Sequence, residues 1–344
     1  MVIATEGNDK SAEGKAKISQ SVKDVILTPE DIYGIEGIIA ELLNHHPIPD
    51  ESFFDNAKLA GQQLPSHIRE EIYNFQRYQT FPGILFQGFP VNDDKIGPTP
   101  PNYRGELVKT TPVTREQALH AMLSSQLGEP IAWTTQQNGN FFNDIIPIKE
   151  NAEKGISSGS TNLFDLHTED AALFPHVPDY LGLMGLRNPD KVPTLISTID
   201  WSSINPEIKA ILAQPRFLIG VNMAHSMGQP QMPTPILFGN PELPYFRINL
   251  NLQQAVPGDE NAAHSLEVMT SELNKNITGV VINQGDFFYL DNYRAAHGRG
   301  PYKPRYDGTD RWLQRLTTVT NLHLFQDIAT SPGSRTLDPN RIRR

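Results

Sequence analysis

Three residues of this chain have the types and the spacing of a metal-binding site. His167 and Glu169 are separated by one residue, and side chains two apart on a strand point to the same face of the sheet. His297 supplies a second imidazole farther along the chain. Two histidines and one carboxylate form a facial triad, which suits non-haem Fe(II) because it leaves positions open for a co-substrate and oxygen. The other histidines, His225 among them, have no spaced partner, and we expect them at the surface or in the core.

Zinc held by two histidines and a glutamate is the rival interpretation of this triad. Catalytic zinc sites of that composition usually carry a helical His-x-x-x-His pair with a glutamate between the histidines, and the chain has no such pair. The chain also has no cysteine, which excludes disulfides, thiolate zinc sites and iron–sulfur clusters. Any metal must therefore use nitrogen and oxygen ligands, and iron is the better prediction.

Two arginines lie beyond His297, where a β-rich run begins. Arg311 and Arg315 are four residues apart in the segment around Trp312–Thr320, so they alternate onto one strand face. A planar guanidinium can hold a carboxylate through two parallel hydrogen bonds. Two such side chains beside a metal site suggest two acidic ligands.

The elements that must position these residues are helices in the first third and short strands after it. Helix starts are indicated by a capping box with proline at the first helical position (Thr28–Asp31, with the helix running to about Leu43), by Ser66, and by Thr114 with Gln117. Many short β-rich runs follow, including Phe246–Leu252 and Phe287–Leu290. This pattern favours a mainly β fold, a sandwich or barrel with flanking helices.

Composition bounds the class of protein. The chain has 344 residues, of which 38% are hydrophobic and 20% charged, so it is globular. No linker or repeat divides it, and we expect a single domain over residues 24–330, with a disordered tail at 1–23 and a C-terminal tail at 331–344. The net charge of −10 repels a phosphate backbone, so we expect no nucleic-acid partner. With no apolar run long enough for a membrane span and no signal peptide, we expect a cytoplasmic protein; the oligomeric state stays open.

Longer motifs around these residues resemble a known family. The clavaminate synthase-like Fe(II)/2-oxoglutarate oxygenases, and within them the free amino-acid hydroxylases that act on arginine, asparagine or lysine, share several segments with this chain between about Leu27 and Asn321. The segments are His167–Ala171, Asp179–Leu183, Leu186–Asp190, Asp291–Arg299 and Pro304–Arg315, with Gln136–Gln137 and Ile145–Lys149.

The resemblance implies a fold and a cofactor site. The fold would be a double-stranded β-helix, a jelly-roll or cupin-like core, with flanking helices. Fe(II) would be held by His167, Glu169 and His297, with 2-oxoglutarate and O2 as co-substrates. Arg311 would bind the distal carboxylate of 2-oxoglutarate, with Thr194 as the hydroxyl partner.

The resemblance also implies how an amino acid is held. Gln136, Ser157 and Arg315 match the positions that hold the substrate's α-amino and α-carboxylate groups. The arginine enzymes grip the guanidinium with an acidic pair, whereas Asn249 and Asn251 stand at the matching positions here. An amide cannot neutralise a cation, which argues against arginine as the substrate.

Asp165 is the residue on which a basic substrate depends. It lies two residues before His167, and strand alternation would place it on the pocket side, where it could grip the ammonium of lysine or ornithine. The rival interpretation is a carboxylate at the pocket rim.

The expected activity is hydroxylation of C3 or C4 of a free L-amino acid, with L-lysine or another basic amino acid as the first choice. Hydroxylation of citrulline, glutamine or asparagine, desaturation or ring closure, and a non-catalytic protein that binds a small acid remain as alternatives. The attacked carbon and its configuration stay open. We also expect the stretch from about His225 to Pro235 to be a loop that closes over the site as a lid.

Overall fold

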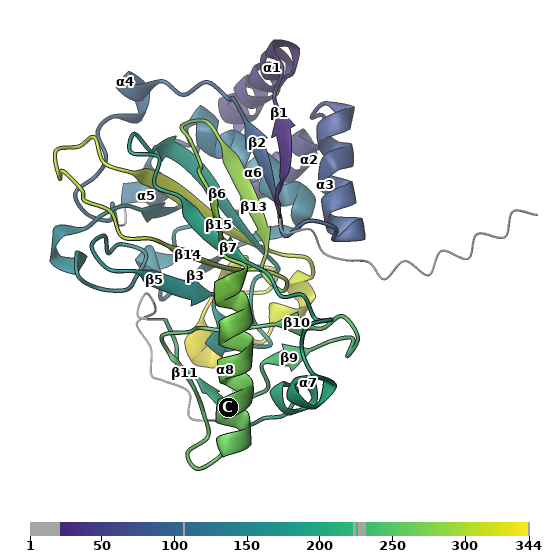
Figure 1. Ribbon diagram of the computed structural model, residues 1–344. Helices are drawn as coiled ribbons and strands as arrows, with labels where there is room; N and C mark the ends of the chain where they lie inside the picture. The colour runs from purple at the N-terminus through teal and green to yellow at the C-terminus, as the bar shows by residue number, and fades with distance from the viewer. Residues whose placement is uncertain (1–20, 106, 223–224, 226–231, 343–344) are drawn as a thin grey trace, which may run out of the picture.

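The computed structural model describes residues 21–105, 107–222, 225 and 232–342 (Figure 1). Most of the expected N-terminal tail, residues 1–20, and residues 226–231 of the expected lid lie outside the described residues. Within the described part of the chain, no helix is both long and apolar enough to span a bilayer.

Two sheets form the centre of the molecule. The larger has the strand order β1-β2-β13-β6-β15-β3-β16, with β4 paired to β15, and the smaller has the order β12-β7-β14-β5. The larger sheet contains β1 (Lys23–Ile26), β2 (Gly83–Gln87), β3 (Glu129–Trp133), β4 (Asn143–Ile145), β6 (Tyr180–Arg187), β13 (Phe287–Asp291), β15 (Trp312–Val319) and β16 (Thr336–Leu337). The smaller contains β5 (Phe164–His167), β7 (Thr194–Ser197), β12 (Thr278–Val280) and β14 (Ala296–Arg299).

The larger sheet is buried on both faces, which explains the nearly continuous apolar runs of β6 and β13. On β13, Phe287 and Tyr289 belong to the core under the helices, whereas Phe288 and Leu290 belong to the core between the two sheets. Gly185 on β6 allows the close approach of another chain segment, since an added Cβ would lie 1.9 Å from the backbone oxygen of Asn283. The face of the larger sheet that is turned toward the smaller sheet carries the candidate site.

Helices cover the outer face of the larger sheet. Figure 1 shows α1 (Pro29–His45), α2 (Glu51–Gly61) and α3 (Ser66–Tyr78) on this side, and α6 (Arg115–Leu127) lies between them and the strands. The predicted capping boxes at Thr28 and Thr114 are both confirmed. The helix predicted from Ser66 is confirmed as α3, whereas the sequence reasoning did not identify α2.

A second group of elements packs beyond the smaller sheet, where Figure 1 shows α8 and α7 at the end opposite to α1. It contains α7 (Pro206–Leu212), α8 (Glu260–Lys275) and two short strand pairs, β8 (Phe217–Ile219) with β11 (Gln253–Ala255) and β9 (Leu237–Phe238) with β10 (Tyr245–Phe246). Of the strand predicted at Phe246–Leu252, only Phe246 lies in a strand, β10. The rest of the prediction is wrong because the chain turns where Leu252 N donates to Asn249 O at 3.0 Å.

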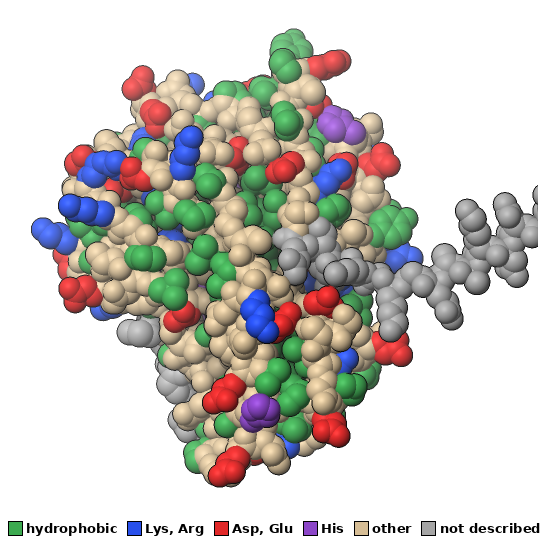
Figure 2. Space-filling model, in the orientation of Figure 1, with side chains coloured by type: hydrophobic (Ala, Val, Ile, Leu, Met, Phe, Trp, Pro, Cys, Tyr) green, Lys and Arg blue, Asp and Glu red, His purple; other side chains and the backbone are tan. Residues whose placement is uncertain are grey.

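The segment after residue 330 carries structure up to residue 342. Its strand β16 pairs in parallel with β3, and Arg335 is buried between Glu51, Asp55 and Glu129. The remaining short helices are α4 (Asp93–Ile96), α5 (Leu107–Thr110) and the 3-10 turns η1 (Gln137–Gly139), η2 (Lys149–Asn151), η3 (Ala171–Leu173), η4 (Leu322–Phe325) and η5 (Pro339–Arg341). On the face drawn in Figure 2, acidic and basic side chains are interspersed over the surface.

Candidate active site

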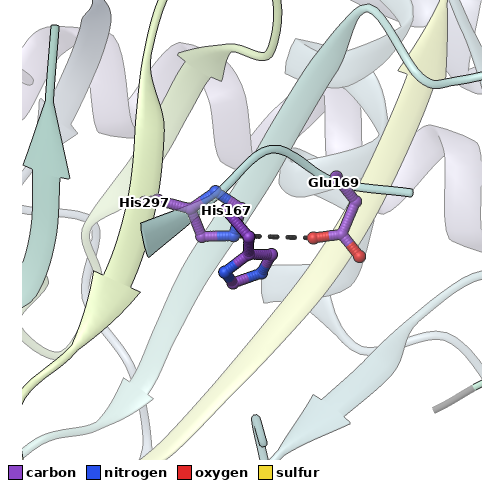
Figure 3. Close-up of side chains that lie close together, drawn as sticks. All are labelled: His167, Glu169 and His297. Atoms are coloured by element: carbon purple, nitrogen blue, oxygen red, sulfur yellow. Dashed lines mark ion pairs between the residues drawn. The ribbon is translucent and has the colours of Figure 1, made fainter. Parts of the chain in front are cut away.

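His167, Glu169 and His297 converge on one point between the two sheets. Strand β14 pairs with β5 so that His297 stands opposite His167, and Glu169 follows in the turn after β5. One ligand atom from each residue lies within 4.8 Å of the other two. Figure 3 shows the three side chains pointing toward one another, with His297 Nε2 3.5 Å from a Glu169 oxygen. The predicted triad is therefore brought together by strand pairing.

Backbone and amide groups hold these side chains in place. His167 Nδ1 lies 2.9 Å from the backbone oxygen of Asp165, which orients the imidazole. The Asn292 side chain accepts from Glu169 N at 2.6 Å and donates to Glu169 O at 3.1 Å, which fixes the turn. Thr168 N donates to Ile248 O at 2.9 Å and ties the same turn to the segment after β10.

The charge states of the cluster suit a metal. Burial, together with the neighbouring His297, lowers the pKa of His167 to about 3, so this imidazole is neutral. Burial opposes the charge on Glu169, but Arg315 and then His297 outweigh it and lower the pKa of the Glu169 carboxyl. The cluster thus offers a neutral imidazole and a carboxylate, the forms that ligate Fe(II), and His297 Nδ1 is a buried atom with no hydrogen-bond partner among the described residues.

Arg311 and Thr194 meet at one end of the cavity beside the triad. Arg311 Nη2 donates to Thr194 Oγ1 at 3.3 Å, and both residues line this cavity with the three triad residues. Burial lowers the pKa of Arg311 to about 10, which still leaves the guanidinium charged at neutral pH. The structure therefore brings together the two residues predicted for the distal carboxylate of 2-oxoglutarate.

Arg315 connects the triad to the residues predicted for the amino acid. Its Nη1 donates to Glu169, and its Nη2 donates to Gln136 Oε1 at 2.5 Å and Asn143 Oδ1 at 2.9 Å. Ser157 lines the same cavity as Arg315. Asn143, on β4 beside β15, was not singled out from the sequence, because only strand pairing brings it to Arg315.

Asp165 and Asn251 lie apart from this lining. Residues 297–299 of β14 lie opposite residues 164–167 of β5, since Arg299 pairs with Phe164 while His297 pairs with His167, so β5 carries one extra residue. The bulge places Phe164 in the cavity lining, which does not include Asp165. Partial burial raises the pKa of Asp165, against the opposing hydrogen bond from Asn251.

Asn249 lies on the other side of His167. It forms an isolated β-bridge with that residue and lines a small second cavity with Asn222 and His225. Asn222 lines both cavities. Of the residues predicted for the side-chain end of the substrate, Asn249 is thus the one that lines either of these two cavities.

A buried network that sequence reasoning missed stands next to the triad. Asp170 adopts a left-handed backbone conformation (φ 56°) and accepts from Trp133 Nε1 at 2.7 Å. His225 Nε2 lies 2.8 Å from Gln136 Nε2, and Thr135 Oγ1 lies 2.7 Å from His225 Nδ1. His225 carried no sequence signal, because its partners are far away along the chain.

Known proteins are similar to this chain over nearly its whole length. No family model matches the chain. It is 31% identical over 338 residues to enduracididine β-hydroxylase of Streptomyces hygroscopicus, covering 90% of this chain and 98% of that protein. It is 27% identical over 342 residues to the L-ornithine/L-arginine 3-hydroxylase of Catenulispora acidiphila, with 90% and 98% covered. The non-haem iron oxygenase OrfP, in a crystal structure with Fe and α-ketoglutaric acid, superposes with a TM-score of 0.86 at 32% identity, covering 92% of this chain and 100% of that chain.

Proposed function

Because the chain belongs to the Fe(II)/2-oxoglutarate-dependent oxygenase family of the free amino-acid hydroxylases and clavaminate synthase, we propose that it hydroxylates C3 or C4 of a free basic L-amino acid, with L-lysine as the first candidate. The observation that carries this proposal is one cavity lined by the triad and by two arginines, Arg311 and Arg315. We also infer that the two sheets form the double-stranded β-helix of this family.

In this proposal, His167, Glu169 and His297 hold Fe(II), and Arg311 with Thr194 binds the distal carboxylate of 2-oxoglutarate. When bound, iron, 2-oxoglutarate and O2 supply the insertion of one oxygen atom into a C–H bond, with release of succinate and carbon dioxide. The chain's own contribution is placement, because a bound geometry that holds one carbon against the reacting centre lowers the entropic part of the barrier.

Arg315, Gln136 and Ser157 are the proposed anchors for the α-carboxylate and α-amino groups. Arg315 is oriented by Glu169, Gln136 and Asn143 before any substrate arrives, so its guanidinium loses little freedom on binding. Because these anchors fix one end of the amino acid, contacts at its other end decide which carbon is attacked.

A basic side chain is supported by the relatives and by one carboxylate. The similar proteins include an L-ornithine/L-arginine 3-hydroxylase and an L-lysine 3-hydroxylase. Asp165, which is hydrogen-bonded to Asn251 outside the lining of the main cavity, is the proposed counter-ion. A second candidate substrate is an amino acid with an amide or ureido end, favoured by Asn249 and Asn222, whose amides line the small second cavity.

The test is succinate formation by the purified protein with Fe(II), ascorbate, 2-oxoglutarate and each free L-amino acid in turn, with products weighed by mass spectrometry. We expect lysine or ornithine to drive succinate release and to gain one oxygen atom. Turnover with glutamine or citrulline and none with basic amino acids would assign the second candidate. If no free amino acid stimulated succinate release, the proposed substrate class would be wrong.

A further inference from the structure

Arg299 is a buried cation of the active-site cavity and is not among the residues proposed to hold iron or the amino acid. It ends β14, two residues beyond His297, and pairs across the sheet with Thr194 of β7. Residues two apart on a strand share a face, and cross-strand partners lie side by side. Arg299 therefore faces the same side as His297 and stands beside the hydroxyl that holds Arg311. It lines the same cavity as Arg311 and is only 3% exposed.

The hydrogen bonds of Arg299 leave one edge of its guanidinium unused. Nη1 donates to Ser160 O at 3.2 Å and to Gly300 O at 2.7 Å, and the guanidinium carbon lies 5.1 Å from the centre of the Tyr302 ring. Nε and Nη2 are buried without a partner in the part of the chain that the structure describes, and the same holds for Nε of Arg311. Carbonyl bonds and the ring thus fix the orientation of Arg299, while its Nε and Nη2 donors have no partner among the described residues.

Two buried guanidiniums without a carboxylate are costly. Among the described residues, no ion pair is formed by Arg299 or Arg311, and the nearby Asp310 accepts instead from the backbone of Arg305 and Tyr306. A buried charge is tolerated when it is paired, and a planar guanidinium pairs best with a carboxylate. The arrangement of Thr194, Arg299 and Arg311 therefore calls for an acidic group from outside the chain.

We propose that Arg299 is a second cationic contact for the distal carboxylate of 2-oxoglutarate, acting beside Arg311 and Thr194. The inference rests on the proposed function and adds a specificity-determining residue to it. Two cations around one carboxylate leave an excess positive charge, so this end of the cavity selects 2-oxo acids that carry a second carboxylate and rejects those with a neutral tail.

The test measures ligand binding without turnover. Wild type, Arg299→Gln and Arg299→Lys are loaded with Fe(II) under anaerobic conditions and titrated by calorimetry with 2-oxoglutarate and with 2-oxobutyrate, which lacks the distal carboxylate. We expect the Kd of 2-oxoglutarate to rise about 10- to 100-fold in Arg299→Gln, while the Kd of 2-oxobutyrate changes by less than about 2-fold. Arg299→Lys keeps the positive charge, so its Kd for 2-oxoglutarate is expected to lie between the values for wild type and Arg299→Gln.

The control is Arg305→Gln, which removes an arginine that is paired with Asp190 at the surface; its Kd for 2-oxoglutarate should match wild type. Thermal unfolding checks that each variant is folded. If Arg299→Gln does not fold, Arg299→Lys replaces it as the test variant. Equal weakening of both ligands would show a structural role and overturn the inference, as would an unchanged Kd for 2-oxoglutarate. Failure of wild type to bind 2-oxoglutarate would overturn the proposed function as well.

Discussion

The Nε2 atom of His225 lies 2.8 Å from Oδ1 of Asp170, the residue that directly follows Glu169. Both side chains are almost fully buried, and the amide of Gln136 is in contact with the same His225 nitrogen. The pair thus connects the turn that carries Glu169 to a residue proposed to hold the amino acid. Its expected function is to position Gln136.

Replacing His225 should weaken amino-acid binding and leave 2-oxoglutarate binding intact. In His225→Leu, Asp170 and Gln136 lose a buried partner, and we expect the KM of the amino acid to rise roughly 10-fold. His225→Gln keeps a polar group at this position and should recover most of the loss. Steady-state kinetics with each co-substrate varied in turn checks this. Equal increases in both KM values would indicate general loosening of the site instead.

Arg315 and Arg311 should have separable effects, since Arg311 bonds to Thr194 whereas Arg315 bonds to Glu169 and Gln136. We expect Arg315→Lys to lower kcat/KM for the amino acid about 100-fold, because a point charge cannot bridge Glu169, Gln136 and Asn143 as the fork does. Arg311→Lys should instead raise the Kd of 2-oxoglutarate. Calorimetry and kinetics on both variants test the assignment, which a reversed pattern would contradict.

Loss of the Glu169 charge should strongly weaken metal binding. Glu169→Gln preserves the shape of the side chain, but it leaves Arg315 without its carboxylate and the metal without an anionic ligand, so we expect Fe(II) affinity to fall by at least about 100-fold. Removal of metal with EDTA should stop succinate release by wild type, and added Fe(II) should restore it. The exposed Glu150→Gln is the matched control. Retained Fe(II) affinity in Glu169→Gln would exclude Glu169 as a ligand.

The prediction of a basic substrate depends on the carboxylate of Asp165. If its carboxylate faces the ammonium, Asp165→Asn should lower kcat/KM for lysine roughly 10-fold, with little effect on glutamine. Asn249→Asp should favour basic over amide side chains, because it adds a charge to the small second cavity. Competition between lysine and glutamine in one reaction, followed by mass, measures both shifts. An unchanged preference in Asp165→Asn would remove the argument for a basic amino acid.

Acid should destabilise the protein partly through His120. This imidazole is fully buried, with Nδ1 2.9 Å from the Tyr289 hydroxyl, and burial lowers its pKa from 6.5 to about 3. Its contribution to stability is present above pH 6.5 and is lost as the pH falls toward 3, because only the unfolded chain then binds the proton. Between pH 7 and 5, wild type should lose about 2 kcal/mol that His120→Gln does not lose. Urea unfolding at the two pH values measures the difference, and equal losses in the two proteins would contradict it.

Local patterns predicted much of this molecule because their interactions are local. The capping boxes at Thr28 and Thr114 satisfy backbone groups within one helical turn, so α1 and α6 follow from nearby residues alone. Period-two alternation likewise predicts that Arg311 and Arg315 share a face, and both line the cavity. The segment Phe246–Leu252 shows the limit, since a β-rich composition does not reveal the turn at Asn249.

What the sequence by itself determined is the chemistry available, namely the residue types of the triad and the arginines, together with the family that their motifs resemble. The tertiary structure decided which of these groups meet. The bulge in β5 moved Phe164 into the lining that alternation had assigned to Asp165, and strand pairing set Arg299 beside Thr194. The pairing of Asp170 with His225 depends on contacts between distant segments. Such contacts follow from strand register and from burial across the whole chain, which no short window of sequence contains.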